Sequence, residues 1–324
     1  MTPSMPDRDL EQFIAESGWT PDSGESARDK AALDGDDDLD LILYTTGTKL
    51  KLLDPATGVR LTLSDESEQV CTACPTHDGM IVYAGAFSKG DENLMSLTLL
   101  DPRDSSYSVL SEEDGMIETT DMMDNYTILY AGGFARDNLG GIALTEFNLK
   151  KRKAEVLTSE NDYIRSAMVS WDNSIIYAGG YRMEPDHQNP IHLFHPSTGL
   201  SFDIAYEDNV IYSVSQVSEY HFVYGGLFGI GDKPGSALTL YSRRLGTKRV
   251  LARENGPIFT TSFIPDNKVL YGGGFTRNNI PGNALVLLDI NNYESTVQAI
   301  EQKWIKSAVP VKRDLFGYLL EGSR

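Results

Sequence analysis

The chain has 324 residues, 40% of them hydrophobic, and its formal net charge is −19. This composition supports a sizeable core, and the acidic balance argues against direct nucleic-acid binding, which relies on clustered Lys and Arg. No stretch approaches the run of about 18 apolar residues that spans a membrane, and the N-terminus lacks the apolar segment of a signal peptide. We therefore expect no membrane insertion, a cytoplasmic location, and other proteins, including basic ones, as partners.

Residues 1–38 differ from the rest of the chain. They are rich in charge and poor in β-branched residues, and they end in the acidic run from Asp34 to Asp38. Such segments cannot bury enough apolar surface to offset the entropy lost on folding. We predict a disordered acidic tail over residues 1–38, followed by one folded domain over residues 39–324.

From residue 39 onward the chain repeats. A glutamate recurs every 47 residues, and a tyrosine follows each glutamate 17 residues later. The glutamates are Glu66, Glu113, Glu160, Glu207, Glu254 and Glu301, and the tyrosines are Tyr83, Tyr130, Tyr177, Tyr224, Tyr271 and Tyr318. A fixed period of about 20–50 residues indicates a repeat architecture.

Each repeat contains four short runs rich in Val, Ile, Tyr, Phe and Thr, bounded by Gly, Pro, Asn or Asp. In the unit that begins at Glu160, these runs are residues 164–168, 175–180, 191–194 and 201–204. Short strands at regular spacing, with glycine motifs in each repeat, are typical of a propeller. Residues 39–324 hold about six periods. We predict an all-β fold, a β-propeller of four-stranded blades, with six blades favoured and seven as the alternative.

The two ends of the repeat array are expected to meet. The first unit lacks its innermost strand, and the run from Ile305 to Val309 is predicted to supply it. This closure would cover strand edges that are otherwise exposed. It leaves the segment from Leu315 to Leu320 as a spare second strand.

The spacing within each unit resembles known propeller repeats. A glutamate, a Ser or Thr six residues later and the end of the third strand some 29 residues further on resemble the WD repeat, with Glu in the position of the WD-repeat His. The Asp of that motif is present at Asp54, Asp101 and Asp289. Glycine pairs such as Gly132-Gly133 and Gly272-Gly273 look instead like Kelch repeats. The resemblance covers most of residues 39–324 and implies a propeller fold.

The repeated glutamates have two interpretations. Six carboxylates in a ring could hold a metal or guide a basic partner, but each is expected on a separate blade, too far from the others to share one ion at about 2.3–2.6 Å. We favour a structural role for all six. Each is predicted to accept a hydrogen bond from the Ser or Thr six residues later in its own unit, or to cap a turn of backbone amides.

One position of the repeat holds a different residue type in each unit. Between a fixed aliphatic residue and the fixed hydroxyl lie Cys71, Glu118, Arg165, Tyr212, Phe259 and Lys306. This position is expected near one mouth of the central channel, and the last five are candidate binding residues because aromatic and Arg side chains are favoured anchors. The alternative is that an unconstrained surface position has drifted. Cys71 and Cys74 form a C-x-x-C, which we predict to be buried and inert because no second cysteine pair completes a zinc site.

Basic residues follow the repeated tyrosines. Arg136 and Arg277 stand six residues after one, as does Lys89, and Arg182 stands five after. They either pair with the glutamates or bind an anionic partner.

Taken together, the sequence favours a non-enzymatic scaffold that mediates protein–protein interaction through one face and the channel mouth. No catalytic motif, metal site or cofactor site is predicted. The alternative is a propeller hydrolase of the lactonase or esterase kind, with a divalent metal in the channel held by Glu118 and Asp121.

Overall fold

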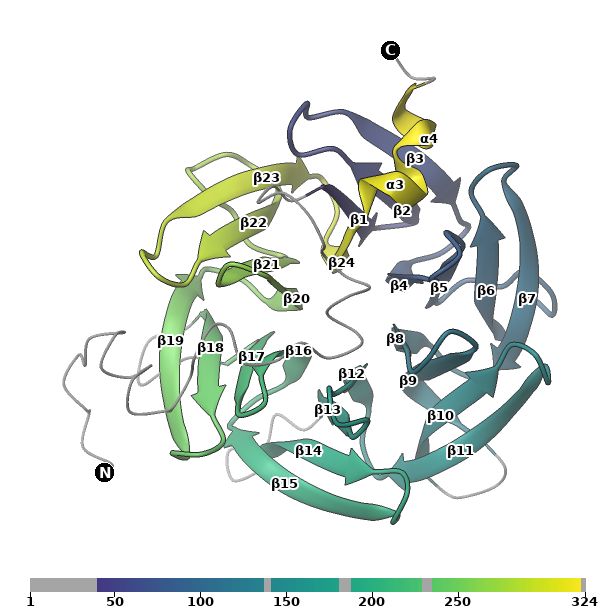
Figure 1. The fold of residues 1–324 in the computed structure, drawn as a ribbon, viewed down its shortest axis with the longest axis horizontal. Coiled ribbons are helices and arrows are strands. Elements are labelled where there is room, and N and C mark those ends of the chain that lie inside the picture. The colour runs from purple at the N-terminus through teal and green to yellow at the C-terminus, as the bar shows by residue number, and fades with distance from the viewer. Residues whose placement is uncertain (1–39, 137–140, 181–187, 229–234, 322–324) are drawn as a thin grey trace.

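The computed structural model describes residues 40–136, 141–180, 188–228 and 235–321. The predicted tail, residues 1–38, and Arg182 lie outside these ranges. Within them the chain forms six four-stranded antiparallel sheets arranged as blades around a central axis (Figure 1). The predicted all-β propeller with six blades is confirmed, and the alternative of seven is wrong.

The strands of each blade are given from the channel outward. Blade 1 contains β24 (Ile305–Val311), β1 (Leu41–Thr46), β2 (Lys49–Leu53) and β3 (Arg60–Asp65). Blade 2 contains β4 (Val70–Pro75), β5 (Ile81–Gly85), β6 (Met95–Asp101) and β7 (Ser106–Glu113). Blade 3 contains β8 (Ile117–Met122), β9 (Thr127–Ala135), β10 (Ile142–Asn148) and β11 (Lys153–Glu160). Blade 4 contains β12 (Ile164–Val169), β13 (Ile175–Gly179), β14 (Asn189–His195) and β15 (Leu200–Glu207). Blade 5 contains β16 (Ile211–Ser218), β17 (His221–Gly226), β18 (Ser236–Ser242) and β19 (Thr247–Glu254). Blade 6 contains β20 (Ile258–Ile264), β21 (Lys268–Gly273), β22 (Asn283–Asp289) and β23 (Ser295–Glu301).

The hydrophobic core lies between neighbouring blades. Leu129 and Ala131 of blade 3, for example, share one buried cluster with Ile164 and Tyr177 of blade 4. Because a blade has a neighbour on each side, the second strands are buried on both faces, and β13 is buried at every position. Such strands show continuous apolar runs instead of alternation, which explains the sequence pattern Ile-Ile-Tyr-Ala-Gly.

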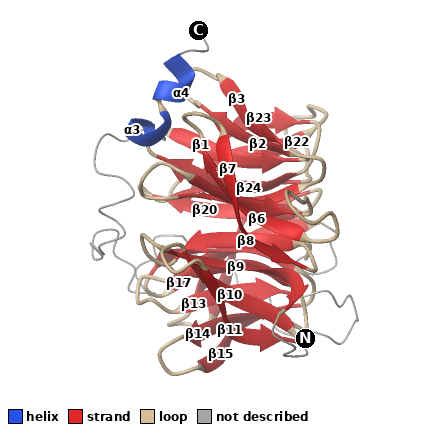
Figure 2. Cartoon of the chain, turned by 90° about the vertical axis from the view of Figure 1, so that its right-hand side faces the viewer, coloured by secondary structure: helices blue, strands red, loops and turns tan. Residues whose placement is uncertain are grey.

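The ends of the array close on blade 1. β24 pairs antiparallel with β1, and Leu43 lies opposite Val309. The predicted closure is therefore confirmed. Figures 1 and 2 show the helical C-terminal segment lying beside this blade.

The prediction of a spare strand from Leu315 to Leu320 is wrong. Two short helices occupy this region, α3 (Arg313–Phe316) and α4 (Tyr318–Glu321). Phe316 and Leu320 join the core cluster of blades 1 and 2. All four strand places in blade 1 are already filled, so the segment buries its apolar side chains as helical turns.

Candidate functional site

Each innermost strand carries a β-bulge near its start. In blade 4, Ile164 pairs with Gly179 and Ser166 with Ala178, so Arg165 has no partner in the ladder. The same skip leaves out Cys71, Glu118, Tyr212, Phe259 and Lys306 in the other blades. A bulge bends the strand and re-aims the extra side chain. The position of the repeat that holds a different residue type in each unit is therefore the bulged residue of every blade.

In five of the six blades a glycine of the second strand admits this bulge, and in blade 1 Thr46 stands at the same place. A Cβ atom on Gly179 would collide with the carbonyl oxygen of Tyr163, which precedes the bulge. The equivalent glycines Gly85, Gly132, Gly226 and Gly273 face the carbonyls of Gln69, Met116, Val210 and Pro257 in the same way. The Kelch-like glycine pairs thus serve a close backbone approach at the bulge.

The bulged residues meet one another at the end of the channel where the inner strands begin, which we call the mouth face. On one side of it, the Arg165 guanidinium forms an ion pair with Glu118. The guanidinium also lies 4.6 Å from the ring centroid of Tyr163 and 6.0 Å from that of Tyr212. Three adjacent blades thus contribute one connected polar group.

On the other side, the Lys306 ammonium lies among aromatic rings. Its Nζ is 3.7 Å from the ring centroid of Phe259, 5.4 Å from that of Trp304 and 5.8 Å from that of Tyr212. Tyr212 and Phe259 pack edge to face at 4.7 Å, and Phe259 and Trp304 lie 5.3 Å apart. Burial lowers the pKa of Lys306, and the Glu118 carboxylate partly opposes this effect. All five predicted binding residues of the inner strands therefore lie in one cluster.

Cys71 completes the ring of bulged residues. Its Sγ lies 3.5 Å from Met116 Sδ, and burial raises the pKa of its thiol, with Glu118 adding to the effect. Both Cys71 and Cys74 are buried, and neither forms a disulfide. Their predicted burial is confirmed, and a thiol held in its neutral form is a poor nucleophile.

Sequence reasoning missed Trp304 and Tyr163. Both belong to a register position three residues after the repeated glutamate, which holds Gln69, Met116, Tyr163, Val210, Pro257 and Trp304. Trp304 is 53% exposed although it packs on Phe259 and Lys306. The signal was available, because a large aromatic stands there beside the turn that enters the inner strand.

The six glutamates accept hydrogen bonds from tyrosines, not from the predicted Ser or Thr. Tyr83 donates to Glu66 at 2.9 Å, Tyr130 to Glu113 at 2.7 Å and Tyr271 to Glu254 at 2.7 Å. Tyr177 and Tyr224 donate to Glu160 and Glu207, and Tyr44 donates to Glu301 across the closure at 2.6 Å. The prediction of the Ser or Thr partner is wrong because a buried phenol needs an acceptor, and the glutamate reaches it.

Four of the six fixed Ser and Thr hydroxyls connect neighbouring inner strands instead. Thr119 accepts a hydrogen bond from the backbone amide of Ala167 at 3.1 Å, and Ser166 accepts one from that of Val214 at 3.1 Å. Thr260 accepts one from the amide of Ala308 at 3.0 Å. Strand edges toward the channel present unpaired amides, so these bonds satisfy them and hold the blades in register.

Basic side chains lie on most of the glutamates. Lys89 pairs with Glu66 at 2.7 Å, and Arg136 and Arg277 pair with Glu113 and Glu254. Lys51 and Lys248, which the sequence did not single out, pair with Glu301 and Glu207 at 2.9 Å. The predicted binding residues Arg136 and Arg277 are thus engaged in ion pairs with the preceding blade, and Arg182 lies outside the described residues.

The proposed hydrolase ligands do not come together. Glu118 pairs with Arg165, whereas Asp121 accepts hydrogen bonds from the backbone amides of Met122 and Val169, both at 2.8 Å. Residues three apart on a strand point to opposite faces. Among the residues that the structure describes, no three His, Cys, Asp or Glu side chains are placed to hold a metal ion.

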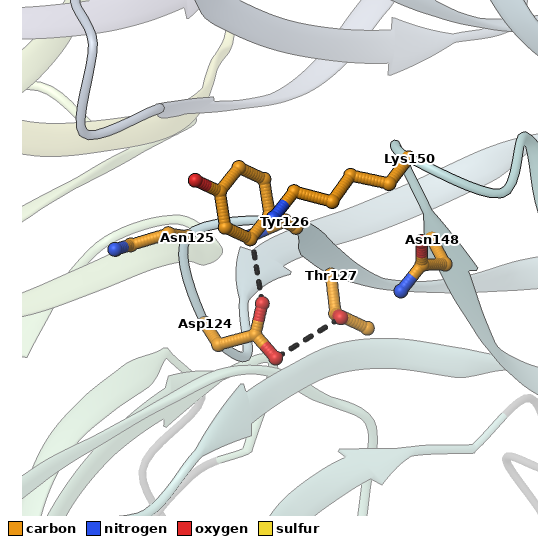
Figure 3. A pocket seen from close by; sticks show the side chains of 6 residues that line it. All are labelled: Asp124, Asn125, Tyr126, Thr127, Asn148 and Lys150. Atoms are coloured by element: carbon orange, nitrogen blue, oxygen red, sulfur yellow. Dashed lines mark hydrogen bonds between the residues drawn. The ribbon is translucent and has the colours of Figure 1, made fainter.

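A shallow pocket lies on the face opposite the mouth, at the turn between β8 and β9. It is lined by Asp124, Asn125, Tyr126, Thr127, Asn148 and Lys150 (Figure 3). The Lys150 ammonium lies 3.2 Å from the Tyr126 ring centroid, and Asp124 accepts hydrogen bonds from the Tyr126 amide and the Thr127 hydroxyl. These groups stabilise the turn and present no acid–base pair.

Comparisons with known proteins show the fold alone. No family model and no curated protein matches the sequence. A solved chain from a nidogen/laminin complex is similar with a TM-score of 0.62 and 10% identity, over 83% of this chain and 97% of that one. TolB from Acinetobacter baumannii is similar with a TM-score of 0.65 and 13% identity, over 84% of this chain and 67% of that one. The protein is a β-propeller, and its resemblance to WD or Kelch repeats is not confirmed at the level of family. In the described residues, no helix has the length and apolar character needed to cross a bilayer.

Proposed function

We propose that this protein is a non-enzymatic scaffold that binds another protein through its mouth face. The supporting observation is that the positions that vary between blades converge there, and all six are bulged residues of inner strands. The repeated positions, by contrast, are occupied by bonds within or between blades. A recognition surface requires side chains that are not fixed by the repeat and that lie together in one place, and the bulged residues meet both conditions.

The composition of the mouth face fits this role. Tyr163, Trp304 and Arg165 are of the residue types that dominate binding energy at protein interfaces. Trp304 remains 53% exposed, and large exposed aromatic groups often mark interaction sites. Since inter-blade hydrogen bonds fix the inner strands, few side chains lose freedom when a partner docks.

One similar solved chain comes from a nidogen/laminin complex, so a propeller of this shape occurs in a protein–protein assembly. At 10% identity it says nothing of the partner of this chain.

The test compares partners captured by cross-linking and mass spectrometry from cells that express this protein. Trp304→Ser and Tyr163→Ser should each lower the recovery of specific partners several-fold. The matched control is Tyr126→Ser, which removes an exposed aromatic from the opposite face and should change nothing. Equal recovery with all three variants would refute the mouth face as the binding site.

A further inference from the structure

The two sides of the mouth face differ in charge. The turns that lead into β4, β8, β12 and β16 carry the carboxylates Glu68, Asp114, Asp162 and Asp208. The turns that lead into β20 and β24 carry no carboxylate after their repeated glutamates, and the second of them carries Lys303. Lys303, Trp304, Lys306, Pro257 and Phe259 therefore form a cationic and aromatic sector, in a protein of net charge −19.

The repeated glutamates that border this sector already have cationic partners. Glu254 pairs with Arg277, and Glu301 pairs with Lys51 at 2.9 Å. Their charges are thus compensated, and they leave the positive charge of the sector largely in place.

Lys306 lacks a carboxylate partner of its own. No carboxylate of the described residues lies within 4.0 Å of its ammonium, although the residue is half-buried and burial lowers its pKa. The aromatic rings around it stabilise the cation only in part. A buried charge without an ion-pair partner is costly, and an anion that reached it would remove that cost.

The nearest internal carboxylate cannot take this role. Glu118 is committed to Arg165, which has the fork of donors that a carboxylate binds best. The bulged residues together carry two cations and one carboxylate, while Cys71 stays neutral because burial raises its pKa. The ring of bulged residues thus has one positive charge left over, and it lies on the Lys306 side.

We infer that this sector binds an acidic segment of a protein partner, with an Asp or Glu side chain on Lys306 and an apolar neighbour against Trp304. The inference rests on the proposed function and deepens it by naming the chemistry of the partner. It replaces the expectation of a basic partner at this place, which came from the overall charge. Lys303, exposed at the edge of the sector, attracts the same segment.

The experiment selects a random dodecapeptide phage library on the immobilised full-length protein. Selected peptides should be enriched in Asp or Glu next to an apolar residue. A synthetic peptide of the selected sequence should lose affinity by about tenfold or more when its acidic residue becomes Gln, since hydrogen bonds to charged groups are worth a factor of this size. Its binding should also weaken as salt rises.

The same loss should follow Lys306→Met, which keeps the chain length and removes the charge, and Lys306→Arg should restore most of the affinity. The matched control is Lys150→Met, because that ammonium also lies over a tyrosine ring, but on the opposite face. Equal thermal stability of the variants shows that the fold is kept.

The outcomes separate this inference from the proposed function. Peptides that need Trp304 but carry neutral or basic residues would overturn the acidic partner and leave the mouth-face scaffold standing. If no selected peptide depended on Trp304, both proposals would fail.

Discussion

The carbonyl oxygen of Pro257 occupies the space that a Cβ atom on Gly273 would need. Gly273 pairs with Ile258, and the next paired residue of the inner strand is Thr260. The glycine therefore admits the backbone that bulges out at Phe259. The same contact between a glycine and a backbone carbonyl recurs in five blades and keeps their backbone constant. The bulged side chain at the mouth face can therefore differ from blade to blade.

The first prediction concerns Gly273→Ala. The added methyl group would clash with the backbone carbonyl oxygen of Pro257, which cannot rotate away as a side chain can, so the bulge must shift. Overpacking costs typically about 1–3 kcal/mol, and a backbone clash belongs at the upper end. Urea denaturation should show a loss of about 3 kcal/mol, and peptide binding at the mouth should weaken as Phe259 moves.

The adjacent glycine provides the control. A Cβ atom on Gly272 would lie 3.1 Å from the Leu285 side chain, 3.2 Å from that of Ile305 and 3.3 Å from the carbonyl oxygen of Ala284, which are much milder contacts than that at Gly273. Other blades carry alanine at this position, at Ala84, Ala131 and Ala178. Gly272→Ala should change stability by less than about 0.5 kcal/mol. Equal losses for both variants would show that the carbonyl contact has no special cost.

The second prediction concerns the bond between tyrosine and glutamate. Tyr271 of blade 6 donates to Glu254 of blade 5 at 2.7 Å, and both residues are buried. Tyr271→Phe removes one donor from a buried carboxylate, and hydrogen bonds to charged groups contribute about 1.5–3 kcal/mol. Chemical denaturation should show a loss in this range. Tyr107→Phe, on a ring that is 53% exposed, should be neutral. A neutral result for Tyr271→Phe would mean that Arg277 alone satisfies Glu254.

The third prediction is a pH dependence. Burial raises the pKa of Glu254 above its ordinary value of about 4.5, and the bonds from Tyr271 and Arg277 only partly oppose this. The folded protein therefore holds that proton more tightly than the unfolded chain. The resulting stability is present below about pH 4.5 and is lost as pH rises through the raised pKa.

Glu254→Gln cannot titrate, so it should not lose this contribution. The free energy of unfolding of the natural protein minus that of the variant should decrease as pH rises above about 4.5. Denaturation curves at several pH values measure this difference. Glu155→Gln serves as the control, because Lys153 lowers the pKa of that exposed carboxyl, and solvent screening keeps its effect small and of opposite sign. A difference that grew with pH would contradict the prediction.

Much of the fold could be predicted because the 47-residue period defines the unit that forms each blade. The recurrence of Glu and Tyr fixed the unit, and the missing inner strand of the first unit matched the extra run from Ile305. The convergence of Arg165 and Lys306 also followed from register alone, since equivalent positions in a closed ring face a common axis.

The remainder depends on geometry that spacing does not reveal. The tyrosine lies 17 residues from its glutamate, and only the packing of two neighbouring blades brings the phenol to the carboxylate. The bulge at Arg165 depends on the carbonyl of Tyr163 approaching Gly179, and a glycine at a strand end is equally compatible with a tight turn. Exposure of Trp304 depends on the neighbouring blade.

The last prediction concerns the C-terminal helices, where the sequence was misread because an apolar run after a strand suits either strand or helix. Phe316 is fully buried against blades 1 and 2, whereas Tyr318 is 42% exposed. Phe316→Ala should cost about 3–5 kcal/mol, the usual range for a buried aromatic, because it leaves a cavity beside the strand that closes the ring. Tyr318→Ala should cost less than about 0.5 kcal/mol. Thermal and urea denaturation measure both. If Phe316→Ala were as mild as Tyr318→Ala, the helices would not support the closure, and β24 would hold the ring through its pairing with β1 alone.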